Sequence, residues 1–157
     1  MSLQSVRDFL AEHAPDIELL VLDQSTATVA EAAASHGVPP DQIAKTLSLR
    51  VGERVILVVA SGLSRLDNKK AKASFGGKVK MLDLSEVEAV TGHPVGGVCP
   101  FGVKPGVEIC CDVSVRAYDE VVPAAGAPNA AVRIAPLRMA EITGATWVDV
   151  CEQRRED

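Results

Sequence analysis

The segment from Gly96 to Gly102 reads GGVCPFG, and its residue types could do chemistry with the main chain. Gly96 and Gly97 carry no side chain, so a ligand can approach their N–H groups closely, while Pro100 restricts the loop. Backbone N–H groups placed in this way can hold a carbonyl oxygen or an oxyanion. Adjacent glycines near a proline also occur in plain turns, so the spacing alone leaves both interpretations open.

Lys45 is the second residue whose position could do chemistry. Alternation over residues 45–51 predicts a strand with Lys45 and Leu47 on its apolar face. The opposite face carries Thr46, Ser48 and Arg50. A buried ammonium rarely goes unpaired. Either the lysine stem extends to water, or its charge faces a cavity that receives an anion or a carbonyl.

The elements that must position these residues are separate helices and hairpin strands, without a regular strand–helix–strand order, which favours an α+β fold. Helices are predicted over the first dozen residues, from the Thr28–Glu31 capping box to Ser35, over Asn68–Phe75 behind Asp67, from Ser85 to Gly92 and over Pro136–Ile142. Strands are predicted over Ile17–Leu22, Lys45–Val51, Val55–Ala60, Lys78–Leu82, Val107–Cys111, Tyr118–Val122, Val132–Ile134 and Trp147–Val150, before a frayed tail, EQRRED.

Length and composition predict one domain over residues 1–157, with 47% apolar residues to build its core. The net charge of −5 argues against a general nucleic-acid coat protein and against a DNA partner, although a local patch can still bind RNA. No apolar run approaches the roughly 20 residues of a membrane span. We therefore expect a cytoplasmic protein without a membrane partner, as a monomer or weak dimer.

A basic stretch interrupts this acidic chain. Six cations, against the single acid Asp67, lie at Arg65, Lys69, Lys70, Lys72, Lys78 and Lys80. Such a run is usually a solvated helix face, but it could also contact phosphates with salt-dependent, sequence-independent affinity.

The four cysteines form no CxxC pair, which favours a reduced setting. Neither they nor the three histidines show the spacing of a zinc finger or an HExxH site, so we expect no metal and no organic cofactor. Cys99 could be a thiol nucleophile, but no histidine stands at a recognisable partner position. His93 is predicted to be an exposed loop residue.

Four segments in order resemble the YbaK/prolyl-tRNA synthetase editing-domain family, over about residues 28–150. They are TVAEAAASHGVPPDQIAKTLSLR, LDNKKAKASFG, VGGVCPFG and AAGAPNAAVRIAPLRMAEITG. The resemblance implies an α+β domain with a central mixed, barrel-like sheet surrounded by helices. It implies hydrolysis, in trans, of mischarged aminoacyl-tRNA, such as tRNA for proline carrying alanine or cysteine. Aminoacyl-tRNA is then the partner, with prolyl-tRNA synthetase as a further candidate.

The resemblance also assigns roles to residues. Lys45 would contact the tRNA end or its aminoacyl group, and the GxxxP loop from Gly96 through Gly97 to Pro100 would engage the ester carbonyl, with substrate-assisted attack by water. Candidate substrate-binding residues are Thr28, Leu47, Cys99, Ala124, Gly126 and Asn129, with Thr26 as a further wall residue. Candidate tRNA-binding residues are Arg65, Lys69, Lys70 and Lys72.

This chain departs from the family pattern at two places. Cys99 stands where relatives commonly have serine, and the 124–130 turn lacks the histidine or serine that many members carry. Two other functions therefore stay open. One is a non-catalytic module that binds tRNA or a synthetase, and the other is a hydrolase that uses the Cys99 thiol.

Overall fold

A β-hairpin forms the centre of the computed structural model, which describes residues 2–153. Its strands, β2 (Ile43–Val51) and β3 (Arg54–Ser61), pair antiparallel. Gly52 makes the tight turn between them with a φ of 61°, a conformation that favours glycine. Every residue of β3 after Arg54 is buried, as the apolar run on both faces predicts. The predicted hairpin is confirmed.

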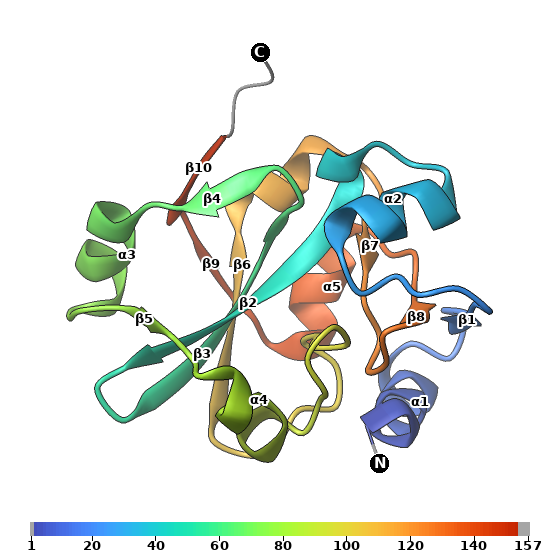
Figure 1. The fold of residues 1–157 in the computed structure, drawn as a ribbon, viewed down its shortest axis with the longest axis horizontal. Coiled ribbons are helices and arrows are strands. Elements are labelled where there is room, and N and C mark those ends of the chain that lie inside the picture. Colours follow the sequence, from blue (N-terminus) through green and yellow to red (C-terminus); the bar gives the residue numbers. More distant parts are fainter. Residues whose placement is uncertain (1, 154–157) are drawn as a thin grey trace.

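Four further strands extend the hairpin into a mixed sheet (Figure 1). β6 (Val107–Asp112) runs parallel to β3, and β9 (Thr146–Val148) runs parallel to β6. β5 (Lys80–Met81) pairs antiparallel with β2, and β7 (Val122–Pro123) pairs parallel with its first residues. The α+β fold is confirmed. The predicted barrel-like closure is not observed, because within residues 2–153 no ladder joins β9 to β5 or β7.

Two short strand pairs lie outside this sheet. β1 (Leu20–Val21) pairs with β8 (Ala130–Ala131), and β4 (Ser64–Leu66) pairs with β10 (Cys151–Gln153). The sequence missed β4, and it placed residues 152–153 of β10 in the tail. Residues 154–157 of that tail lie outside the described part of the chain.

The strands predicted between residues 118 and 134 were largely wrong. A 3-10 helix, η2 (Val113–Ala117), precedes Tyr118, which is its C-terminal cap. Of the strand predicted over Tyr118–Val122, only Val122 lies in a strand. Ile134 makes an isolated bridge with Val121, and the ladder falls on β8 instead. A chain that changes partners every two residues shows no sustained alternation for a sequence pattern to detect.

Helices cover the sheet. Within the described residues they are α1 (Ser2–His13), α2 (Val29–His36), α3 (Asn68–Phe75), α4 (Leu84–Thr91) and α5 (Pro136–Thr143), with a short 3-10 turn, η1 (Pro40–Gln42). Thr28 and Glu31 form the predicted capping box of α2, and Asp67 caps α3 as predicted. Ser85 does not cap α4, since the side chain of Asp83 accepts the hydrogen bond from the Ser85 N–H.

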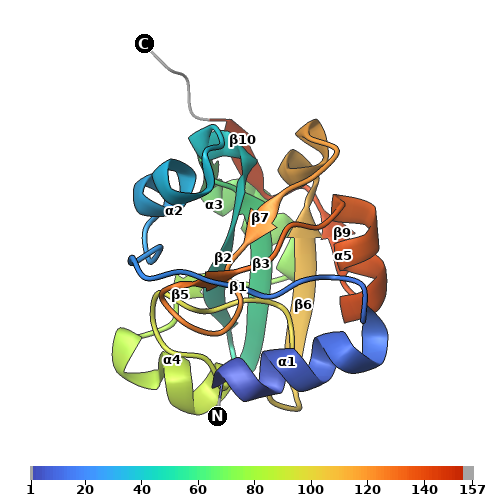
Figure 2. The same ribbon diagram turned by 90° about the vertical axis from the view of Figure 1, so that its right-hand side faces the viewer.

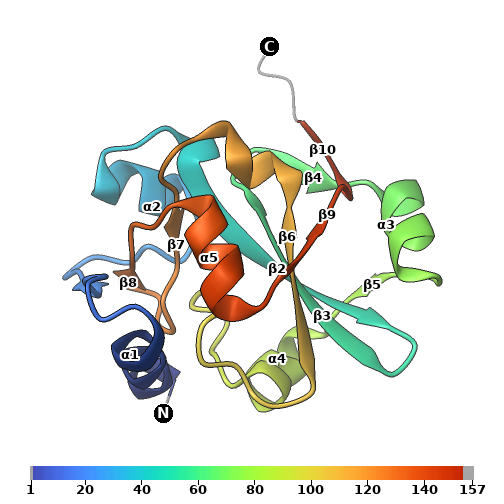
Figure 3. The same cartoon turned by 180° about the vertical axis from the view of Figure 1, so that it is seen from behind.

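The two faces of the sheet carry separate cores. On one face, α5 packs on the sheet (Figure 3) and α1 lies next to it (Figure 2), around buried Val59, Phe101 and Met139. On the other face, α3 packs Ala71 and Phe75 against Leu49 and Val58. None of the helices in residues 2–153 combines the length and apolar character needed to cross a bilayer.

Candidate functional site

A cavity of about 230 Å³ lies beside β2, between α2, α4 and the glycine loop. Small side chains form much of its wall, including Ala27, Ala44, Ala124 and Ala131. Its polar groups come from Thr26, Thr28, Lys45, Thr46 and Ser48. Three exposed apolar side chains border it, Met81, Leu84 and Val95. The described lining residues include no histidine, cysteine, aspartate or glutamate, so Lys45 is the one ionisable side chain among them.

The cavity lies where the edge of β2 is uncovered. β7 pairs with β2 at Ile43 and Ala44, and β5 pairs with it at Leu49 and Arg50. Between these ladders, residues 45–47 have no neighbouring strand on that side among the described residues, and Lys45, Thr46 and Ser48 border the cavity. The backbone groups of this short segment can therefore face a ligand.

Thr46 also borders the cavity, although the sequence analysis did not assign it to the site. Its hydroxyl oxygen is buried and has no hydrogen-bond partner among the described residues, and Thr46 borders the cavity. A buried polar atom without a partner is uncommon because desolvation costs about 1–3 kcal/mol. The signal in the sequence was the pair of hydroxyl residues, Thr46 and Ser48, on one face of an otherwise apolar strand.

Lys45 borders the same cavity as Gly96, so the structure brings these two predicted residues together. The Lys45 ammonium donates hydrogen bonds to the carbonyl oxygens of Gly62, at 3.1 Å, and Ser64. Gly62 lies in the connection from β3 to β4, and Ser64 is the first residue of β4. The charge is therefore held by main-chain acceptors at the side of the cavity.

The glycine loop is held by close main-chain packing. A Cβ atom at Gly97 would lie 2.6 Å from the amide nitrogen of Ala127, so only glycine fits without a shift. The Gly97 N–H already donates to the Pro94 carbonyl at 2.9 Å, and the Gly97 carbonyl accepts from Gly126 N–H at 2.9 Å. Gly97 and Pro100 are buried and do not border the cavity, whereas Gly96 and Val98 do.

His93 and Cys99 lie together beneath this loop, contrary to the sequence analysis. His93 is fully buried, not exposed, and its Nε2 lies 3.5 Å from the Cys99 Sγ and 2.7 Å from the Phe101 carbonyl oxygen. Its Nδ1 lies 2.5 Å from the hydroxyl oxygen of Ser2, at the start of α1. Burial lowers the pKa of His93. The ring thus links the loop to α1.

A histidine therefore does stand next to Cys99, but the pair does not form a nucleophile of the usual kind. Burial raises the pKa of the Cys99 thiol to about 12, so the thiol stays protonated near neutral pH. Cys99 belongs to the core and does not border the cavity. These facts support a packing role.

The other predicted substrate-binding residues divide between the cavity and its supports. Thr28 and Ala124 border the cavity. Leu47 packs with the core under α3, and Gly126 packs against α1, where an added Cβ would lie 2.8 Å from Val6. Asn129 donates to the Leu22 carbonyl at 2.9 Å. These three residues do not border the cavity.

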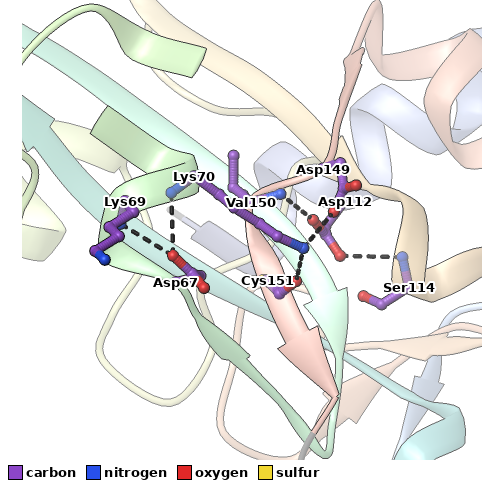
Figure 4. A network of polar contacts seen from close by, with 8 residues as sticks. All are labelled: Asp67, Lys69, Lys70, Asp112, Ser114, Asp149, Val150 and Cys151. Atoms are coloured by element: carbon purple, nitrogen blue, oxygen red, sulfur yellow. Dashed lines mark hydrogen bonds and ion pairs between the residues drawn. The ribbon is translucent and has the colours of Figure 1, made fainter. Parts of the chain in front are cut away.

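The basic residues around α3 also lie away from the cavity wall. Lys70 donates to Asp149 at 3.2 Å and to the Cys151 carbonyl at 3.1 Å, which joins α3 to the start of β10 (Figure 4). The buried carboxylate of Asp112 accepts from Val150 N–H and Ser114 N–H in the same network. Arg65, Lys69 and Lys72 are exposed.

Comparisons with known proteins place the chain in a family. The model of the aminoacyl-tRNA editing domain matches residues 23–142. The chain is 42% identical to the uncharacterized protein YwhH of Bacillus subtilis, over 97% of this chain and 98% of that protein. It is 33% identical to EbsC of Enterococcus faecalis, provisionally named a Cys-tRNA(Pro)/Cys-tRNA(Cys) deacylase, over 80% of this chain and 76% of that protein.

Solved structures agree. One described provisionally as a trans-editing enzyme for prolyl-tRNA synthetase has a TM-score of 0.88 and 32% identity, covering 96% of this chain and 97% of that one. The chain also matches part of the proline–tRNA ligase of Bacillus cytotoxicus, with 28% identity over 57% of this chain and 16% of the ligase. The chain belongs to the aminoacyl-tRNA editing domain family, which confirms the resemblance seen in its sequence. This membership supports deacylation of aminoacyl-tRNA as the general activity.

Proposed function

We propose that this protein hydrolyses, in trans, the ester bond of tRNA for proline that carries a small wrong amino acid, such as alanine or cysteine. The observation that carries the proposal is the cavity that joins Lys45 and Gly96 in a chain of the editing family. At about 230 Å³ it is smaller than the roughly 300–1,000 Å³ of common ligand pockets, which suits a small aminoacyl group. The names of EbsC and of the trans-editing structure support the choice of tRNA.

The ester carbonyl would lie against the main chain of the glycine loop. Gly96 and Val98 border the cavity, and Gly97 uses its own N–H within the loop. A preorganised donor to a developing oxyanion contributes about 3–4 kcal/mol, because it needs no reorientation during the reaction. The role of Gly97 and Pro100 is then to fix the loop that presents those donors.

Among the described residues, the cavity wall offers no carboxylate or imidazole as a general base. We therefore assign activation of the attacking water to the substrate, through the ribose hydroxyl of the terminal adenosine. A bound cysteine could instead attack its own ester carbonyl with its thiol. The S–C bond forms, the C–O bond to the tRNA breaks, the thiol proton passes to the leaving ribose oxygen, and water then opens the resulting thiolactone. Both routes need positioning more than side-chain catalysis.

Lys45 would orient the substrate at the wall of the cavity. Its ammonium is fixed by two carbonyl oxygens, so its charge is already in place before the substrate arrives. Thr46 would donate or accept a hydrogen bond with the substrate, since its oxygen has no partner among the described residues.

The test is release of labelled amino acid from tRNA for proline charged with alanine, cysteine, serine or proline. We expect wild type to release a small non-cognate amino acid and Lys45→Ala to lose turnover. Lys104→Ala is the matched control, because Lys104 is an exposed lysine outside the cavity whose ammonium caps the end of α4. Equal rates for all three proteins would remove Lys45 from the mechanism. A non-catalytic binding module would leave the ester lifetime unchanged or longer.

A further inference from the structure

A second hollow, of about 600 Å³, is lined by residues from the end of β2, the start of β3, the end of α3 and the segment that leads into β5. Its wall carries four cations and no acidic side chain among the described residues, and the cations are Arg50, Arg54, Lys78 and Lys80. Figure 1 shows β5 between α3 and the β2–β3 hairpin, where this hollow lies. A positive surface of this size contrasts with the net charge of −5 of the whole chain.

Two strands lead from the cavity into the hollow. On β2, Ser48 borders the cavity and Arg50, two residues further on the same face, borders the hollow. On β5, Met81 borders the cavity and Lys80 borders the hollow. Ser48 and Arg50 are about 7 Å apart along β2, the length of two strand residues, so an extended ligand that fills the cavity would be within reach of the hollow.

Three of the four cations of the hollow, Arg50, Lys78 and Lys80, are poorly neutralised by the described residues. Arg50 and Lys80 stand directly opposite each other in the β2–β5 register, and like charges in that position destabilise a sheet. Arg50 has a partner in Glu86 at 3.4 Å, and this exposed single contact contributes little. Arg54 is held more firmly, since it donates to both Glu108 carboxylate oxygens, at 2.8 and 2.9 Å, and to the Phe75 carbonyl at 2.9 Å. Lys78 and Lys80 form no ion pair with any described residue. An anionic ligand would relieve this repulsion.

We infer that this hollow binds phosphates of the RNA strand whose acylated end occupies the cavity. The inference rests on the proposed function, and it places the main phosphate contact beside β5 and not at Lys69, Lys70 and Lys72 on α3. Lys70 is engaged with Asp149 and the Cys151 carbonyl. Arg50 joins the site although it lies outside the basic stretch of the sequence, while Arg54 lines the wall but is engaged with Glu108 and the Phe75 carbonyl.

The probe is a fluorescently labelled minihelix of the tRNA acceptor stem that ends in CCA and carries no amino acid, titrated with protein at several salt concentrations. For Lys78→Gln/Lys80→Gln, we expect weaker binding and a slope of log K against log[salt] that is smaller by about 1.4, since each phosphate contact on a single strand contributes about 0.7. Lys69→Gln/Lys72→Gln removes the same charge from α3 and should change the slope by less than half as much. Lys78→Arg/Lys80→Arg should restore the wild-type slope.

An equal or larger change in the α3 variant, or no change in the hollow variant, would overturn the inference. So would stronger, lysine-dependent binding of polyglutamate than of the minihelix, because the hollow would then fit an acidic protein. Thermal melts confirm that each variant is folded. The minihelix carries no aminoacyl ester, so the binding result is separate from the proposed hydrolysis. If wild type releases no amino acid but the minihelix slope falls as stated, the proposed function fails and the RNA site stands.

Discussion

Gly97→Ala is the perturbation whose effect the structure defines best. The added Cβ would meet three main-chain atoms of Ala127, the nitrogen at 2.6 Å, the Cα at 2.8 Å and the carbonyl carbon at 2.9 Å. Main-chain atoms cannot rotate away as a side chain can, so the glycine loop must separate from the 124–130 turn. That movement would strain the hydrogen bond from Gly126 N–H to the Gly97 carbonyl.

The expected magnitude comes from overpacking, which costs about 1–3 kcal/mol. Since 1 kcal/mol shifts the melting temperature of a domain of this size by about 2–4 °C, we expect a fall of about 2–12 °C. Displacing a positioning loop by about 1 Å can lower the rate about 10²-fold, so kcat/KM should fall much more than stability alone explains.

The assay is deacylation of mischarged tRNA for proline, measured together with a thermal melt of the same preparation. Gly144→Ala is the control, because Gly144 ends α5 with a φ of 68° and an added Cβ there meets no atom within 4 Å. Its backbone strain of about 1–2 kcal/mol should lower the melting temperature and leave kcat/KM unchanged. The reasoning is refuted if Gly97→Ala keeps wild-type kcat/KM, or if both variants lose activity equally.

Three further predictions follow from single contacts. Thr46→Val should keep or raise the melting temperature, because the substitution removes a buried oxygen without a described partner. The same variant should have a lower kcat/KM for the correct substrate. A melting temperature that falls by several degrees would show that the hydroxyl has a structural partner. Cys99→Ser should keep deacylase activity, because the Cys99 thiol has a pKa of about 12 and is not a thiolate at neutral pH. Loss of turnover in a folded Cys99→Ser protein would favour the thiol-dependent hydrolase. The Arg138 guanidinium holds the pKa of Asp16 at about 2, below its usual 3.8. This pair therefore stabilises the protein above about pH 4, and the stabilisation is lost as the pH falls toward 2. The melting temperatures of wild type and Asp16→Asn should converge over that range, and a constant difference would contradict the assignment.

Local signals in the sequence predicted local structure well. The capping box of Thr28 and Glu31, the Asp67 cap and the helix end at Gly92 all depend on residues a few positions apart. Asp83 caps α4 in place of Ser85, and since both side chains can accept the required hydrogen bond, residue type alone does not choose between them. Short strands such as β4 and β10 pair across about 85 residues, and no local pattern records that pairing.

The candidate site was predicted where a residue type was unusual in its local sequence, and was missed where distant segments meet. Lys45 stood out because it interrupts the apolar face of a strand. Gly96 stood out because it is followed by Gly97 and lies close to Pro100. The acceptors of the Lys45 ammonium are main-chain oxygens of a turn, which have no residue signature. His93 looked like a loop residue because it precedes a proline, yet α1 covers it from the other end of the chain. The hollow beside β5 joins Arg50 and Arg54 to Lys78 and Lys80 only after the strands pair.

Catalytic turnover on a defined mischarged tRNA tests the central claim most directly. Wild-type protein would be mixed with a hundredfold excess of Ala-tRNA or Cys-tRNA for proline, and the amino acid released would be followed against the spontaneous rate. We predict release of many moles of amino acid per mole of protein from one of these substrates, with Pro-tRNA left intact. Release at no more than the spontaneous rate from every substrate would contradict the account.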